Sequence, residues 1–177
     1  MSTTNWILDP THSEVQFKIK HLMITNVTCN FNSFEVTAST EEHDFTKATV
    51  SFKAMVNSIS TNNEQRDGHL KSADFFNAES FPAIVFNATK AESADADGNF
   101  VLHGDLTIKD ITKNVQLNVE FGGVTKDPYG NIKAGFTING KINRNDFGLT
   151  WNAALETGGV MVSEEVKIMS EIQLVKQ

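Results

Sequence analysis

The sequence predicts an all-β protein, an antiparallel β-barrel of about eight strands formed by residues 1–177 as a single domain. Apolar and polar side chains alternate with a period of two along most of the chain, which is typical of strands with one buried face. Short turn sequences such as "ADADGN", "FGG" and "DPYGN" separate the alternating runs. Long strands joined by short turns favour an antiparallel meander, and about eight strands close a barrel that is either packed solid or holds one ligand.

The alternating runs follow one another through the chain, and only residues 60–78 interrupt them. Within that stretch, "NNEQRDGHL" lacks proline and β-branched residues, so it predicts a short helix near residues 62–72 that covers one end of the barrel. Phe75 and Phe76 follow and are expected to anchor the segment. The apolar runs contain, in order, Val15, Phe17 and Ile19; Val50, Phe52, Ala54 and Val56; Ile84, Phe86 and Ala88; Phe100, Leu102, Leu106 and Ile108; Val115, Leu117, Val119 and Phe121; Phe136, Ile138 and Ile142; and Val166, Ile168, Ile172 and Leu174.

Composition excludes several classes of protein. The net charge of −7, with a pI near 5.2, argues against nucleic-acid binding, which requires clustered Lys and Arg. No apolar run approaches the roughly 20 residues of a transmembrane segment. One cysteine excludes an intrachain disulfide, and "MSTTNWILDP" lacks the features of a signal peptide. We therefore expect a cytoplasmic protein, or a periplasmic one if a leader has been removed.

Catalytic and metal-binding motifs are not found in the sequence. It has no G-x-S-x-G or H-E-x-x-H motif, Cys29 lacks a recognisable catalytic flank, and the histidines are not spaced as metal ligands. We expect no catalytic residue, no metal and no cofactor. His21 lies on an apolar strand face with Phe17 and Ile19, where it is either a hydrogen-bonded core residue or a ligand contact.

Two short segments combine charged residues with apolar anchors. Arg66 and Asp67 lie in "EQRDGHL", and Arg144 and Asp146 lie in "INRNDFGL". Charges near an apolar interior need partners, because leaving one unpaired costs about 3–5 kcal/mol. Such pairs either lock one end of the barrel or border its polar mouth, and both interpretations stay open.

These segments also carry a family resemblance. "WILDPTHSEVQFKIKHL", "SISTNNEQRDGHLKSADFFNAESFPAIVF", "GDLTIKDITKNV" and "INRNDFGLTWNAALETGGVMVSEEVKI" occur in the order and spacing of YceI-like proteins, over nearly the whole chain. The resemblance implies a lipocalin-like barrel whose apolar lumen holds a long-chain isoprenoid lipid, such as an isoprenoid quinone or a polyprenyl precursor, for transport, storage or sequestration without catalysis. It leaves a homodimer open. The chain has Cys29, Val36, Asp110 and Ser163 where relatives commonly carry glycine, which affects the expected width of the lumen.

The expected ligand contacts form two groups, one in the lumen and one at the mouth. Each phenylalanine of the first group could equally fill a solid core, and a solid structural or stress-associated barrel is one alternative function. The other alternative is an enzyme that acts on a lipid head group with His69 and Asp67 as an acid–base pair. The lumen group is Phe17, Ile19, His21, Phe31, Phe34, Phe52, Phe86, Phe100, Phe121 and Phe136; the mouth group is Arg66, Asp67, His69, Phe75, Phe76, Arg144 and Asp146.

Overall fold

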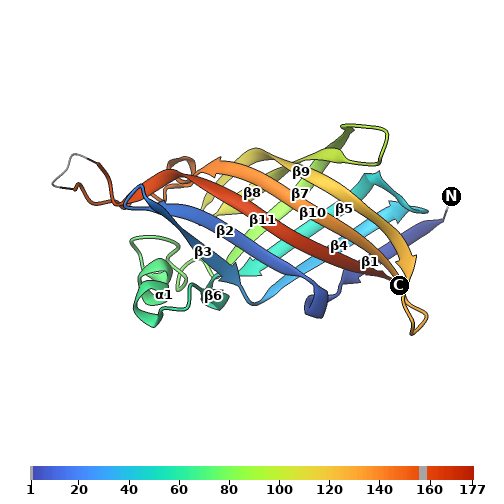
Figure 1. Cartoon of the computed structure of the whole chain (residues 1–177), viewed down its shortest axis with the longest axis horizontal. Helices are drawn as coiled ribbons and strands as arrows, with labels where there is room; N and C mark the ends of the chain where they lie inside the picture. Colours follow the sequence, from blue (N-terminus) through green and yellow to red (C-terminus); the bar gives the residue numbers. More distant parts are fainter. Residues whose placement is uncertain (1, 156–158) are drawn as a thin grey trace.

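The chain folds into an elongated barrel of antiparallel strands with one short helix beside it (Figure 1). The structure is a computed structural model that describes residues 2–155 and 159–177. Within these residues, three single 3₁₀ turns accompany the strands: η1 (Pro10–His12), η2 (Val56–Ser58) and η3 (Arg144–Phe147). The helix is α1 (Glu64–Lys71), and the strands are β1 (Thr3–Leu8), β2 (Glu14–His21), β3 (Thr25–Phe31), β4 (Phe34–Glu41), β5 (Asp44–Met55), β6 (Ile59–Ser60), β7 (Ala83–Ser93), β8 (Phe100–Ile108), β9 (Ile111–Lys126), β10 (Ile132–Asn143) and β11 (Val162–Lys176).

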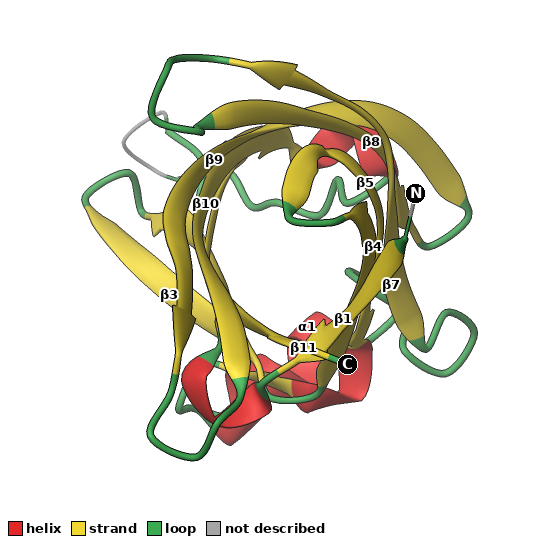
Figure 2. Cartoon of the chain, turned by 90° about the vertical axis from the view of Figure 1, so that its right-hand side faces the viewer, coloured by secondary structure: helices red, strands yellow, loops and turns green. Residues whose placement is uncertain are grey.

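Eight of the strands form a closed ring. The ring runs in the order β1, β4, β5, β7, β8, β9, β10 and β11, and β11 pairs back with β1. All of these pairings are antiparallel, and Figure 2 shows the ring from the end at which the two termini lie. The expected eight-stranded barrel and the short helix near residues 62–72 are therefore confirmed.

The remaining strands extend the sheet at the other end of the barrel. β11 pairs with β1 through its last residues, and with β2 between Val162 and Glu171. Pro10 separates β1 from β2, because its ring nitrogen cannot donate to a strand ladder. β2 pairs with β3, and β6 pairs only with β3, so the sheet stops there. α1 follows β6 directly and lies beside this free edge (Figure 1).

Local interactions fix α1 in place. The Asn63 side chain caps the helix by accepting a hydrogen bond from the Arg66 backbone N–H. α1 buries none of its own residues, but Phe75 and Phe76, just beyond its end, are both buried. These two rings anchor the segment, as expected. No helix in the described part of the chain is long and apolar enough to cross a membrane.

The barrel interior near the termini is filled by aromatic rings. Phe45 lies 4.8 Å from Phe136, 5.1 Å from Trp6 and 5.8 Å from Phe121, measured between ring centroids. Trp6 is 1% exposed and donates a 2.9 Å hydrogen bond to the Thr40 hydroxyl. We call Trp6, Phe45, Phe121 and Phe136 the aromatic plug, because they close this end of the barrel.

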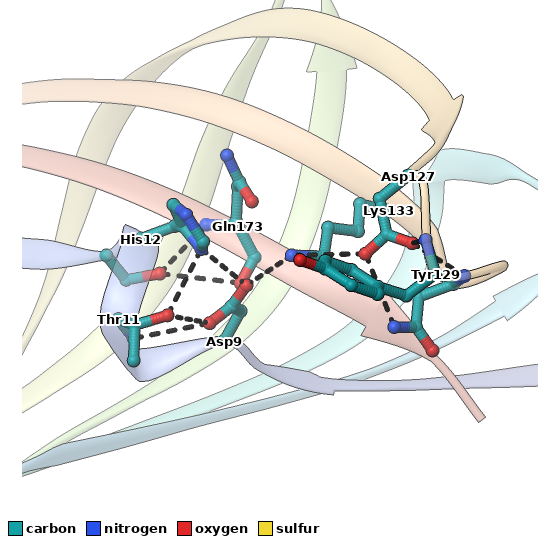
Figure 3. A network of polar contacts seen from close by, with 9 residues as sticks. Asp9, Thr11, His12, Asp127, Tyr129, Lys133 and Gln173 are labelled. Carbon is teal, nitrogen blue, oxygen red and sulfur yellow. Dashed lines mark hydrogen bonds and ion pairs between the residues drawn. The ribbon is translucent and has the colours of Figure 1, made fainter.

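A polar network fastens the chain to the outside of the barrel at this same end (Figure 3). The Asp9 carboxylate accepts hydrogen bonds from Lys133 Nζ at 2.6 Å and Thr11 Oγ1 at 2.9 Å, and it lies 2.8 Å from His12 Nδ1. The hydrogen bond from Lys133 is the main reason why the pKa of Asp9 lies well below its usual range. Asp9 therefore ties η1 to β10 as a carboxylate.

Candidate functional site

A large cavity lies at the α1 end of the barrel. Its volume is about 590 Å³, within the range of about 300–1,000 Å³ that small-molecule sites occupy. Its walls come from β2, β3, α1, β8, the region around η3 and the first half of β11. Apolar side chains make up most of the lining: Val15, Phe17, Ile19, Val27, Phe31, Phe52, Leu70, Phe75, Phe76, Ile84, Leu106, Ile108, Ile142, Leu149, Trp151, Met161, Val162, Val166 and Ile168.

A second cavity of about 140 Å³ adjoins the first deeper in the barrel. The two share Val15, Phe52, Leu106 and Ile168 in their walls. Along β11 the first cavity extends from Val162 to Ile168 and the second from Ile168 to Leu174. Together they follow roughly 40 Å of this strand. The second ends at the aromatic plug, because Phe45 and Phe136 line it. The hollow interior is therefore blind, with its mouth beside α1.

Eight of the ten residues expected in the lumen line these cavities. Phe17, Ile19, His21 and Phe31 line the larger cavity, Phe86, Phe100 and Phe136 line the smaller one, and Phe52 lines both. The His21 ring makes no hydrogen bond within the described residues, which favours the second of its two interpretations, a ligand contact, over a hydrogen-bonded core residue.

Phe34 and Phe121 line neither cavity, and their expected place in the lumen is corrected. Phe34 packs against Phe52, with 6.4 Å between the ring centroids. Phe121 belongs to the aromatic plug and packs against Phe45 and Phe136.

The residues expected at the mouth divide in a similar way. Arg66, His69, Phe75, Phe76 and Arg144 line the larger cavity, whereas Asp67 and Asp146 do not.

Neither aspartate borders the hollow interior, so both are corrected as mouth residues. The Asp67 carboxylate accepts hydrogen bonds from Thr61, at 2.8 Å from the backbone N–H and at 2.6 Å from the hydroxyl. Asp146 is exposed and borders a shallow polar depression between β9 and β10.

The expected Arg144–Asp146 pair is not formed. Arg144 is 2% exposed, and its guanidinium donates to backbone carbonyls instead of a carboxylate. Nη1 donates to Leu149 at 2.6 Å and to Trp151 at 2.7 Å, Nε to Ser163 at 2.8 Å, and Nη2 to Val162 at 3.4 Å. Desolvation lowers the pKa of Arg144. Arg144 thus ties the segment after η3 to the start of β11 and forms one wall of the mouth.

Arg66 and Asp67 also do not pair with each other, because adjacent helical residues point in different directions. Arg66 donates from Nε to the Thr61 hydroxyl at 2.7 Å and from Nη2 to the Thr61 carbonyl at 2.8 Å. Both side chains therefore fasten α1 to Thr61 at the end of β6.

His69 is held at the mouth by Asp74. Its Nε2 lies 2.9 Å from Asp74 Oδ2, and its ring meets Phe75 and Trp151 edge to face at 5.0 and 4.8 Å. The His69–Asp67 acid–base pair of the enzyme alternative is not formed, since residues two apart on a helix do not face each other. Trp151, to which we assigned no role from the sequence, completes the aromatic rim.

Comparison with known proteins identifies the family to which this barrel belongs. Residues 6–174 match the family model described as a YceI-like domain. The chain belongs to the YceI-like family. It is 42% identical over 165 residues to UPF0312 protein SA2479 of Staphylococcus aureus strain N315, covering 93% of each chain.

Solved structures share the architecture. The Campylobacter jejuni YceI protein is 32% identical, with a TM-score of 0.76 over 96% of each chain. Burkholderia cenocepacia BcnA is 19% identical, with a TM-score of 0.78 over 94% of this chain and 98% of that one. A Saccharophagus degradans domain described as polyisoprenoid binding is 14% identical, with a TM-score of 0.65 over 97% of this chain and 98% of that one. The last two show similarity of fold alone.

The four departures from the glycines of the YceI-like pattern lie at different places. Cys29 lines the larger cavity and Val36 the smaller one, so both side chains take up lumen volume. Burial raises the pKa of the Cys29 thiol to about 12. Asp110 and Ser163 line neither cavity; the Ser163 hydroxyl instead accepts a 3.0 Å hydrogen bond from the Lys20 backbone N–H.

Proposed function

We propose that this YceI-like protein binds a long-chain isoprenoid lipid, an isoprenoid quinone or a polyprenyl precursor, in its barrel for transport, storage or sequestration and without catalysis. The observation that carries the proposal is the blind, apolar interior of about 590 Å³ together with its extension of about 140 Å³. A narrow hollow closed at one end suits one long hydrophobic chain. A polar group at one end of that chain would remain beside α1.

The energetics of burial support a ligand of this kind. At about 0.8 kcal/mol per buried CH₂, each five-carbon isoprene unit contributes about 3–4 kcal/mol before the costs of ordering. A few buried units therefore suffice for tight binding. The description of the Saccharophagus degradans domain as polyisoprenoid binding agrees with this ligand class.

The two alternatives fit the geometry less well. A solid barrel is difficult to reconcile with the larger cavity, although the aromatic plug does fill the opposite end. An enzyme acting on a lipid head group would lack the His69–Asp67 pair on which that hypothesis depended.

Extraction of the purified protein tests the proposal. We expect organic solvent to release an isoprenoid lipid that mass spectrometry identifies, or else the lipid-free protein to take up one molecule of added polyprenyl quinone. A folded protein that releases no lipid and takes up none would contradict the proposal.

A further inference from the structure

The charged residues of the larger cavity are all of one sign. Every charged or histidine side chain in its lining is a base: Lys20, His21, Arg66, His69 and Arg144. No Asp or Glu of the described residues lines this cavity. The whole chain nevertheless has 22 acidic residues against 15 Lys and Arg, a net charge of −7. The charged residues at the mouth are therefore positive, whereas the net charge of the protein is negative.

Three of these bases, Lys20, Arg66 and Arg144, form no direct ion pair within the described residues. No carboxylate among the described residues lies within 4.0 Å of the charged nitrogens of Lys20, Arg66 or Arg144. The nearby acids are already engaged, Asp67 by Thr61 and Asp74 by His69. Glu164 acts on Arg144 only through space, and Asp67 reaches Arg66 only through the shared Thr61 hydroxyl, so no carboxylate contacts the charged nitrogens of Lys20, Arg66 or Arg144 directly.

Donors remain free on two of the cations. Arg66 uses Nε and Nη2 to bind Thr61, while its Nη1 makes no hydrogen bond within the described part of the chain. Lys20 Nζ likewise has no partner there, and Lys20 is exposed. Arg144 differs, because four of its five N–H groups already donate to carbonyls, so it contributes charge more than free donors.

We propose that the mouth selects amphiphiles with an anionic head group, a carboxylate or a phosphate, over neutral amphiphiles with the same tail. Charges of one sign beside low-dielectric walls concentrate their field in the opening. Arg66 Nη1 and Lys20 Nζ supply charge-assisted hydrogen bonds, and the guanidinium fork matches both anions. This inference rests on the proposed function, since it concerns the head group of the ligand whose tail occupies the barrel.

Matched ligand pairs test the inference. The full chain is loaded with the neutral probe N-phenyl-1-naphthylamine, which is then displaced by geranylgeranyl phosphate or geranylgeraniol, and by palmitate or hexadecanol. We expect each anion to bind roughly tenfold more tightly than its alcohol, as hydrogen bonds to charged groups predict. The ratio should fall as salt increases, because ions screen the attraction at the open mouth.

Substitutions identify the residues that cause the preference for anions. Arg66→Gln and Lys20→Gln should each lower the anion-to-alcohol ratio severalfold; because the ratio is taken within each variant, a change in the cavity wall that affects both ligands equally cancels. Arg66→Lys, which keeps the charge, should restore part of the ratio. Lys71→Gln is the matched control, since it removes a positive charge from α1 outside the cavity lining and should leave the ratio unchanged.

The possible results separate this inference from the proposed function. Equal affinity for anion and alcohol, or a ratio that neither Arg66→Gln nor Lys20→Gln changes, would overturn the head-group inference while the barrel remains a lipid site. Failure of all four ligands to displace the probe from folded protein would count against the proposed function itself. A preference for both geranylgeranyl phosphate and palmitate over their alcohols supports an anion site, and a preference for geranylgeraniol over hexadecanol, which share a hydroxyl head group, identifies the isoprenoid tail.

Discussion

Replacement of Arg144 by methionine should destabilise the protein strongly. The guanidinium is 2% exposed and donates to the carbonyls of Leu149, Trp151, Val162 and Ser163. Methionine has a similar length but no donor, so these carbonyls lose their partner. A buried polar group left without a hydrogen bond costs about 1–3 kcal/mol. Because water can reach some of the carbonyls after the change, we expect a total loss of about 3–5 kcal/mol in the free energy of unfolding.

Urea denaturation followed by circular dichroism measures this loss. Arg144→Lys should fall between the wild type and Arg144→Met, since an ammonium keeps the charge but cannot reach all four carbonyls. Lys141→Met is the control; it removes an exposed cation from the end of β10, three residues before Arg144, and should change the free energy of unfolding by no more than about 0.5 kcal/mol. A loss below about 1 kcal/mol for Arg144→Met would refute the reasoning that the guanidinium holds the wall of the mouth.

Three further predictions concern Asp9 and Cys29. Asp9→Asn keeps the cap on η1 but loses the carboxylate that binds Lys133. Thermal or urea unfolding at pH 7 should show a loss of about 1.5–3 kcal/mol in the free energy of unfolding. Glu35→Gln, at an exposed position, is the control and should change that free energy almost not at all. Because folding lowers the Asp9 pKa, the carboxylate contributes its full stabilisation above the unfolded pKa of about 3.9. The difference in free energy of unfolding between wild type and Asp9→Asn should therefore shrink as the pH falls below that value. A difference that does not depend on pH would contradict this prediction. The buried Cys29 thiol, with its pKa raised to about 12, should react slowly with a thiol reagent at pH 8 until urea is added. Cys29→Trp should obstruct the cavity and weaken the affinity with which ligands displace a bound probe at least tenfold. Thr28→Trp, on the opposite face of β3, is the control and should leave that affinity unchanged. Equal effects of the two variants would show that ligands do not enter along this wall.

The barrel could be predicted because the period of two is a local property of each strand. The position of each side chain along the barrel axis could not be predicted, since it depends on the register between strands. Phe52 and Phe121 both occupy inward positions of alternating runs, but Phe52 faces the hollow and Phe121 packs in the aromatic plug. Phe45 at the centre of the plug was missed, because the alternating run recognised there begins only at Val50.

The polar part of the site was predicted less well, because sequence neighbours are not necessarily spatial partners. Arg144 stands two residues from Asp146 but donates to carbonyls as far along the chain as Ser163. Lys20 falls on the polar side of its strand pattern and nevertheless lines the mouth, because β2 ends there. The concentration of cations at the mouth arises only when β2, α1 and η3 come together.

A series of isoprenols of increasing length tests the central claim most directly. Isothermal titration with alcohols of two to eight isoprene units should show affinity that rises with each added unit and then levels off once the blind interior is full. Affinity that does not depend on chain length, in a protein shown to be folded, would contradict the account that the tail lies inside the barrel.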